Sequence, residues 1–132
     1  MIDRRQLSAW SPYMLSVLRI MTALLFLQHG LSKFFGFPMP RPATFQLFSL
    51  SGAAGAIELV AGILLALGLF TRTTAFIASG QMAFAYFIAH APRDFYPIVN
   101  AGELAALYCF VFLYFAAAGG GTWSVDALRK SA

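Results

Sequence analysis

The stretch IELVAGILLALGLFTRTT, residues 57–74, decides the fold. Residues 57–70 are apolar apart from Glu58, and the turn that follows is short. Gly68 can end one helix and Thr71 can cap the next. A turn of this length joins only antiparallel neighbours, so the stretch predicts a hairpin of two apolar helices.

The composition places this hairpin in a membrane. Hydrophobic residues make up 60% of the chain, aromatic residues 16% and charged residues 11%, whereas an average soluble domain is about 25% charged. The mean hydropathy is +0.74. A chain of 132 residues fits one domain. Its net charge of +4 is scattered near segment ends, which favours contact with lipid headgroups and argues against binding to nucleic acid.

Four segments are long and apolar enough to span a bilayer, which needs about 20 residues each. The fold expected is therefore all-α, an integral membrane bundle of four antiparallel helices formed by one domain, residues 1–132. Arg4 and Arg5 precede the first apolar run, but that run is longer than the core of a signal peptide, so we expect a retained helix. The expected spans are 13–35, 53–70, 73–91 and 98–118.

The segments outside the spans carry helix breakers. Three prolines between residues 38 and 42 keep the first link non-helical, and the glycines of residues 119–121 end the last span. Beyond them, Ser124 can cap a short helix over about 124–131. The single cysteine, Cys109, excludes an intrachain disulfide.

Four spans put both termini and the turn at residues 68–74 on one side of the membrane. That side carries more arginine and lysine than the other, so the positive-inside rule places both termini in the cytoplasm. The cations on the expected cytoplasmic side are Arg4, Arg5, Arg72, Arg129 and Lys130, against Arg41 and Arg93 opposite, with Lys33 near that edge.

Ionisable side chains are expected to meet inside the bundle. In LFLQHGLSKFF, residues 25–35, His29 and Lys33 share one helix face at i, i+4. Glu58 and Glu103 each lie about six residues into their spans from the same side, which is roughly 9 Å. Because a charge facing lipid costs about 2.5–3.5 kcal/mol on insertion scales, these groups should face inward and pair. Lys33 is expected to pair with Glu58 or Glu103.

The second carboxylate would meet His29 or Asn100, or be protonated. Asn100 lies three residues before Glu103 on the same face, and His90 ends the third span on this side. Such a set of groups can handle protons, but an ion pair that fixes helix register looks the same. The catalytic candidates are His29, Lys33, Glu58 and Glu103, and the cofactor-binding candidates are His29, Lys33, Asn100, Glu103 and Phe34.

A second group of charges is expected at the cytoplasmic end. Arg72 lies in the hairpin turn and Asp126 in the tail, so a structural tether between them is predicted. Arg19 could join this cluster, or extend its side chain towards the interface.

Three motifs together resemble the DoxX family of small four-helix bacterial membrane proteins. They are H-G-x-x-K from His29 to Lys33, E-x-x-x-G-x-x-L-x-L-G-x-x-T-R from Glu58 to Arg72, and G-x-x-S-x-D ending at Asp126. The resemblance covers about residues 19–129 and implies a multi-pass protein of the bacterial inner membrane. One related branch is similar to a subunit of a thiosulfate:quinone oxidoreductase, other relatives are linked to protection from oxidative stress, and more distant ones are cargo receptors or chaperones.

Two main hypotheses follow, with transport of a small solute or protons as a third. In the first, the chain is a quinone-linked redox subunit: His29 and Lys33 donate to the quinone carbonyls, and Glu58 or Glu103 exchanges protons. No haem, flavin, iron–sulfur or metal motif is recognised, so electrons would require a redox-enzyme partner. In the second, the chain is a non-catalytic assembly protein that recognises a membrane protein or lipid through the link after residue 35. Either could form a homo-oligomer.

Overall fold

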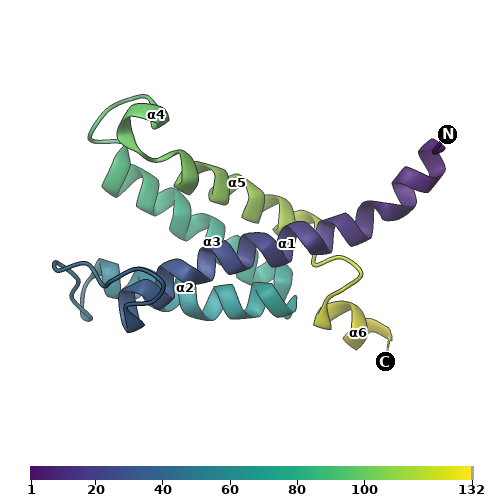
Figure 1. The fold of residues 1–132 in the computed structure, drawn as a ribbon, viewed down its shortest axis with the longest axis horizontal. Helices are drawn as coiled ribbons and strands as arrows, with labels where there is room; N and C mark the ends of the chain where they lie inside the picture. The colour runs from purple at the N-terminus through teal and green to yellow at the C-terminus, as the bar shows by residue number, and fades with distance from the viewer. Residues whose placement is uncertain (132) are drawn as a thin grey trace.

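The computed structural model describes residues 1–131, and these are all helix and loop, without a β-strand (Figure 1). The all-helical fold class is therefore confirmed. The helices, in chain order, are α1 (Arg4–Phe35), α2 (Leu50–Leu67), α3 (Thr71–Ala85), the π-helix η1 (Tyr86–His90), α4 (Pro97–Asn100), α5 (Glu103–Ala118) and α6 (Val125–Ser131).

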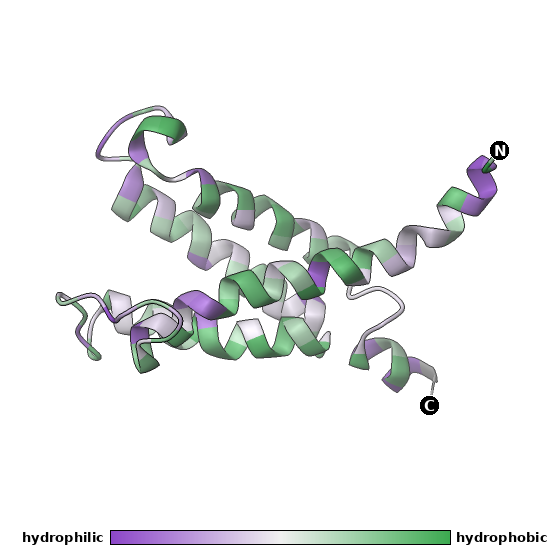
Figure 2. Ribbon diagram, viewed as in Figure 1, coloured by the Kyte–Doolittle hydropathy of each residue, from purple (hydrophilic) through white to green (hydrophobic). Residues whose placement is uncertain are grey.

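The longer helices pack in the order α1, α2, α3 and α5, with α1 against α2, α2 against α3, and α3 against α5. Both termini and the α2–α3 turn lie at one end of this body, and the links before α2 and around α4 lie at the other (Figure 1). Hydrophobic residues cover the middle of the helices, and hydrophilic residues gather towards the ends (Figure 2). By length and composition, α1 and α2 could each cross a membrane, while α5 is a shorter apolar helix.

Glycines let α1 and α2 approach closely, as small residues do between membrane helices. A Cβ on Gly30 would lie 2.8 Å from the backbone nitrogen of Leu59 and 3.0 Å from the carbonyl oxygen of Gly55. A Cβ on Gly62 would lie 2.9 Å from the Cβ of Leu27. The two backbones are therefore in contact over several turns, which fixes their relative register.

The hairpin turn forms at the expected place with different capping. Gly68 ends α2 in the left-handed conformation, with φ at 71°, as the sequence indicates. Thr71 does not cap α3: it is the first helical residue, and the N-cap position is Phe70, also left-handed with φ at 51°. The cap is supplied from the distant tail, because the Asp126 carboxylate accepts the Phe70 and Thr71 backbone N–H groups, both at 2.9 Å.

The last long helix begins later than expected. The span predicted over 98–118 divides at Ala101, whose φ of 61° ends α4, and α5 starts at Glu103. The Asn100 side chain stabilises this break, since its Oδ1 accepts the Gly102 N–H at 2.8 Å. Pro97 stands in the first turn of α4, where a proline lacks only an N–H that would be unpaired anyway.

A buried arginine closes the end where the termini lie. Arg19 is fully buried, and its guanidinium donates to the carbonyls of Leu65 and Trp123, each at 2.8 Å, and to the carbonyl of Gly120. Ser16 on the same helix donates to the Gly120 carbonyl at 3.0 Å and accepts the Trp123 N–H at 2.9 Å. Arg19 therefore lies with the charges at this end, which is one of the two positions expected for it, and it holds the loop between α5 and α6.

The predicted tether between Arg72 and Asp126 is wrong, because the two side chains bind backbone groups and not each other. Arg72 donates to the carbonyls of Ala116 and Ala117 at the end of α5, and no Arg72–Asp126 ion pair forms among the described residues. Each charge instead satisfies backbone groups that a helix end leaves unpaired. Ser124 does cap the terminal helix, as predicted, since its Oγ accepts the Ala127 N–H at 3.1 Å.

The Asp126 cap predicts a loss of stability in acid. Desolvation raises the pKa of the Asp126 carboxyl, but the hydrogen bonds from Thr71 and Phe70 and the charge of Arg129 outweigh it, so the pKa lies below its usual value. A lowered folded-state pKa means that the cap stabilises the fold above the ordinary aspartate pKa and is lost as pH falls through the lowered value. Replacing a cap by alanine costs about 0.5–2 kcal/mol.

We therefore expect Asp126→Ala to lower the thermal midpoint of the detergent-solubilised protein at neutral pH. In acid, the thermal midpoints of the variant and the wild type should lie closer together. Gel-filtration recovery after heating at each pH measures this. Glu103→Gln is the control, because it removes an exposed carboxylate that accepts no hydrogen bond among residues 1–131. A difference between Asp126→Ala and wild type that stays constant with pH would contradict the assignment of Asp126 as an ionised cap.

Candidate functional site

The centre of the candidate site is an ion pair between α1 and α2. The Lys33 Nζ donates to both carboxylate oxygens of Glu58, at 2.9 and 3.0 Å. The Lys33 side chain is 23% exposed and that of Glu58 is 5% exposed. It is the only ion pair among residues 1–131. Of the two partners that the sequence left open for Lys33, the structure selects Glu58.

The close helix approach produces this pair. A Cβ on Gly55 would lie 2.8 Å from the Phe34 ring and 3.3 Å from the Cδ of Lys33. The missing side chain at Gly55 therefore leaves the space through which the lysine stem crosses α2 to reach Glu58, one turn further along. A larger residue in place of Gly55 would push α1 away from α2 and keep the Lys33 amine from reaching Glu58.

A cavity of about 360 Å³ lies beside the ion pair, in the middle of the bundle. His29, Lys33 and Glu58 supply its polar wall together with Tyr108, and the sequence indicates that His29 and Lys33 share this face. His90 of η1 also lines it. The remaining lining residues are Phe26, Met82, Ala85, Ala89, Ala101, Leu104 and Ala105.

Two polar groups in this wall are not used by the protein. Neither the His29 ring nor the Tyr108 hydroxyl makes a hydrogen bond within the part of the chain that is described, and the two rings meet edge to face with centroids 6.3 Å apart. Lys33 retains a third N–H after its two bonds to Glu58. The cavity therefore presents donors from α1 and α5 to whatever occupies it.

An aromatic stack forms the floor of the cavity. Tyr108 stacks on Phe112 with the ring planes only 6° apart and the centroids at 5.5 Å, and Phe26 meets Phe112 edge to face at 4.8 Å. Phe26 and Phe112 are fully buried and Tyr108 is 5% exposed. This packing fixes the Tyr108 ring and so fixes where its hydroxyl lies.

Glu103 does not belong to this site, and its predicted inward orientation is wrong. The inward face of α5 is set by Tyr108, Phe112 and Phe115, which are all buried. Glu103 precedes Tyr108 by five residues, which is about 140° around a helix of 3.6 residues per turn. Its side chain is exposed and lines an outer hollow with Pro97, Ile98, Ala101, Leu104 and Leu107.

Asn100 and Phe34 also lie outside the cavity. Asn100 is 1% exposed, and its amide is used within the loop: Nδ2 donates to the Tyr86 hydroxyl at 3.2 Å and to the Asp94 carbonyl at 3.0 Å, while Oδ1 accepts from Gly102. Phe34 packs against Phe45, with ring centroids 5.7 Å apart, on the side of the link. The predicted cofactor-binding role of these two residues is therefore not supported by their positions, which lie outside the cavity lining.

Tyr108 is the site residue that the sequence reasoning missed. Its signal was the spacing of Tyr108, Phe112 and Phe115 at i, i+4 and i+7, which marks one helix face. Gln81 of α3 lies close enough to act on the Glu58 carboxylate. Its Oε1 is buried and has no hydrogen-bond partner among residues 1–131.

Comparison with known proteins supports the resemblance that these motifs suggested. The DoxX family model matches residues 14–91. An uncharacterized protein of Haemophilus influenzae (strain ATCC 51907 / DSM 11121 / KW20 / Rd) is 44% identical over 131 residues, covering 91% of this chain and 93% of its own length. No solved structure matches the chain. The range that the family model matches contains His29, Lys33, Glu58 and Arg72, and the chain belongs to the DoxX family.

Proposed function

We propose that this protein is an integral protein of a bacterial cytoplasmic membrane with four antiparallel spans: α1, α2, α3 with η1, and α5. The 20 residues of α3 and η1 together would reach about 30 Å, the thickness of the hydrocarbon core. Large apolar side chains on the outside of the body support the proposal, among them Phe76, Phe84 and Phe110, which are 66%, 65% and 68% exposed. Such surfaces suit lipid better than water.

The proposed orientation has both termini in the cytoplasm. Both termini lie at one end of the body (Figure 1), and the excess of arginine and lysine at that end supports a cytoplasmic location. We expect a fluorescent-protein fusion at the C-terminus to be active in the cytoplasm, and an alkaline phosphatase fusion within the link of residues 36–49 to be active in the periplasm. Activity of phosphatase fused at the C-terminus would overturn the orientation.

We further propose that the cavity binds the ring of a quinone and that the protein is an accessory or subunit of a redox enzyme. The observation that carries this proposal is a cavity of about 360 Å³ whose wall offers unused donors, within the range of about 300–1,000 Å³ typical of small-molecule sites. Donors that stand apart in an apolar cavity match a flat ring bearing two carbonyl oxygens. Membrane quinones carry two electrons and two protons.

Each polar side chain of the cavity would have its own role. His29 and Tyr108, with the remaining N–H of Lys33, would donate to carbonyl oxygens and orient the ring. Glu58 would take or release a proton at its carboxylate, and Lys33 would hold it ionised between transfers. Electrons would come from a partner enzyme.

A second candidate function, a non-catalytic assembly protein, is favoured by the link of residues 36–49. Phe48 is 96% exposed and Phe37 is 67% exposed, and exposed large apolar groups mark surfaces that bind proteins or membranes. In this case the Lys33–Glu58 pair would serve the register of α1 and α2, and the cavity would stay unused.

Quinone binding by purified protein tests the first candidate. We expect the wild-type protein to bind a short-chain ubiquinone or menaquinone, and His29→Ala or Tyr108→Phe to weaken this binding, each by about tenfold for a lost hydrogen bond of about 1.5 kcal/mol. Glu103→Gln is the matched control, because Glu103 lies outside the cavity, and should bind as wild type does. Equal binding by all four proteins, or none by any, would favour the assembly function.

A mutant cycle on the ion pair separates its structural and functional roles. Lys33→Met or Glu58→Leu alone leaves a buried charge unpaired and should destabilise the protein by about 3–5 kcal/mol, whereas the double variant should recover most of that loss. We expect the double variant to fold, as judged by thermal midpoint, and to bind quinone less tightly than wild type. Wild-type affinity in the double variant would assign the pair to structure alone.

A further inference from the structure

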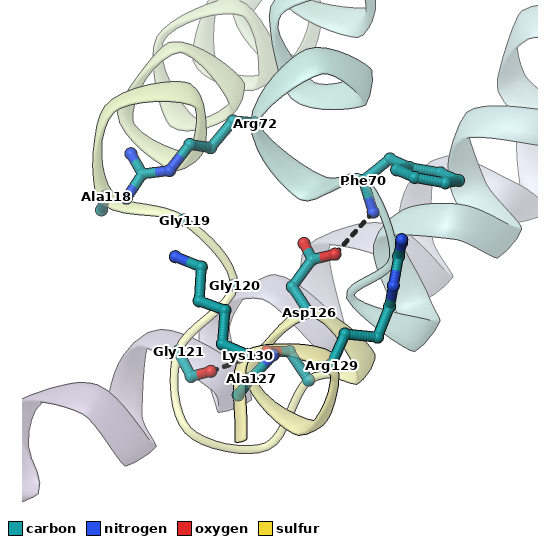
Figure 3. Close-up of a pocket in the computed structure, with 11 residues that line it drawn as sticks. Phe70, Arg72, Ala118, Gly119, Gly120, Gly121, Asp126, Ala127, Arg129 and Lys130 are labelled. Carbon is teal, nitrogen blue, oxygen red and sulfur yellow. Dashed lines mark hydrogen bonds between the residues drawn. The ribbon is translucent and has the colours of Figure 1, made fainter. Parts of the chain in front are cut away.

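A second cavity, of about 550 Å³, lies at the end of the body that carries α6 and the α2–α3 turn. Its walls are the α2–α3 turn, the start of α3, the glycine loop of residues 119–121 and α6 (Figure 3). It is separate from the cavity beside the Lys33–Glu58 pair, because the two cavities share no lining residue. Three of its lining side chains are cationic, namely Arg72, Arg129 and Lys130, and one, Asp126, is anionic.

The single carboxylate does not neutralise these cations by contact. Asp126 uses both oxygens to accept the N–H groups of Phe70 and Thr71. Lys130 has no hydrogen bond or ion-pair partner in the described chain, and Figure 3 shows its side chain running beside the glycine loop. The cavity therefore has an excess of positive charge. Some of its N–H donors have no acceptor within the described residues.

Arg72 also keeps donors available. Its Nη1 is bound to the carbonyls of Ala116 and Ala117, which leaves Nε and Nη2 without a hydrogen bond among residues 1–131. A Cβ on Gly119 would lie 3.2 Å from Nη2, and Gly119 has a φ of 85° that favours glycine. The absence of a side chain there gives the guanidinium room beside the cavity.

The loop that forms this wall is held firmly. Buried Arg19 donates to the carbonyl oxygens of Gly120 and Trp123, so these two oxygens are already bound to a cation. A wall braced in this way suits an anion site, because little ordering is needed when the anion binds.

Apolar side chains surround this basic cavity. Phe70 is 55% exposed and stacks under the Arg129 guanidinium, whose carbon lies 5.0 Å from the ring centroid. Trp123 and Leu128 nearby are 56% and 70% exposed. Cations beside exposed aromatic and aliphatic groups are typical of the membrane–water interface, where basic pockets bind lipid headgroups.

We propose that this cavity binds the headgroup phosphate of an anionic glycerophospholipid from the cytoplasmic leaflet. Arg72 and Lys130 would donate to the phosphate oxygens, Arg129 would add charge at the edge, and the acyl chains would run past Phe70 into the bilayer. The proposal rests on the membrane orientation proposed above but not on quinone binding. Reporter fusions test that orientation independently, so the two failures are distinguishable.

Lipid retention by the purified full chain tests the site. The protein in detergent is mixed with phosphatidylglycerol or phosphatidylcholine, and bound lipid is counted by native mass spectrometry. We expect phosphatidylglycerol to be retained in preference to phosphatidylcholine, and Arg129→Gln with Lys130→Gln to reduce its affinity roughly tenfold or more, at about 1 kcal/mol per basic residue. Both side chains are exposed, so folding should survive, which thermal midpoints check.

Arg4→Gln with Arg5→Gln is the matched control, since it removes the same charge from exposed positions at the start of α1 and should leave retention unchanged. Arg72→Gln is a second variant inside the cavity and should also reduce retention. Equal loss in the control pair, or no loss in either cavity variant, would overturn the site. Displacement of the lipid by glycerol phosphate at equal concentration would show a site for free anions and overturn the assignment to lipid.

Discussion

The contact between α1 and α2 through the Lys33–Glu58 pair is the constraint on which the rest of the structure depends. Glu58 is 5% exposed on its side chain and can stay ionised at that burial only beside a cation. Lys33 reaches it because Gly30 and Gly55 bring the two backbones into contact. Any other register of α1 on α2 would leave two charges without partners, so the pair and the glycines together specify one arrangement.

The opposite end treats a buried cation in another way. Arg19 has no contacting carboxylate, and three backbone carbonyls from α2 and from the loop before α6 accept its N–H groups. The Leu65 carbonyl also accepts the Gly68 N–H and the Gly120 carbonyl also accepts the Ser16 hydroxyl, so Arg19 adds a further donor to groups at a helix end and in the loop. The two ends are therefore built differently: one concentrates opposite charges beside a cavity, and the other uses charges to cap helices and brace a loop.

The sequence was sufficient for the parts of the fold that depend on position along the chain. Apolar runs located the long helices, Gly68 and Ser124 marked ends and caps correctly, and the i, i+4 spacing of His29 and Lys33 put both on the cavity. Position around a helix was harder to derive. Glu103 was expected six residues into a span, but α5 begins at Glu103, and the large aromatic side chains of α5 take the inward face and leave Glu103 exposed.

Contacts between distant segments and backbone groups were beyond reach for another reason. The Asp126 carboxylate caps α3 across 55 residues of chain, and Arg72 binds carbonyls at the end of α5. Charge complementarity suggested that Arg72 and Asp126 pair, because a sequence displays side-chain charges but not the unpaired N–H and C=O groups at helix ends. Those groups were the stronger partners at both positions.

The state of the polar groups in the central cavity weighs against a purely structural pair. An ion pair that only fixes register needs to be packed and satisfied, and Lys33 with Glu58 meets that need. The same wall nevertheless carries a histidine ring and a tyrosine hydroxyl without hydrogen bonds in the described chain, and the nearby Gln81 has a buried, unpartnered Oε1. Buried polar groups cost free energy unless they are paired, and apolar side chains would fill the same space without that cost. Gln81 lies outside the lining of this cavity, but the Tyr108 hydroxyl and the His29 ring belong to it. The occupant that we propose would pair these two groups, because a quinone ring offers carbonyl oxygens that accept hydrogen bonds.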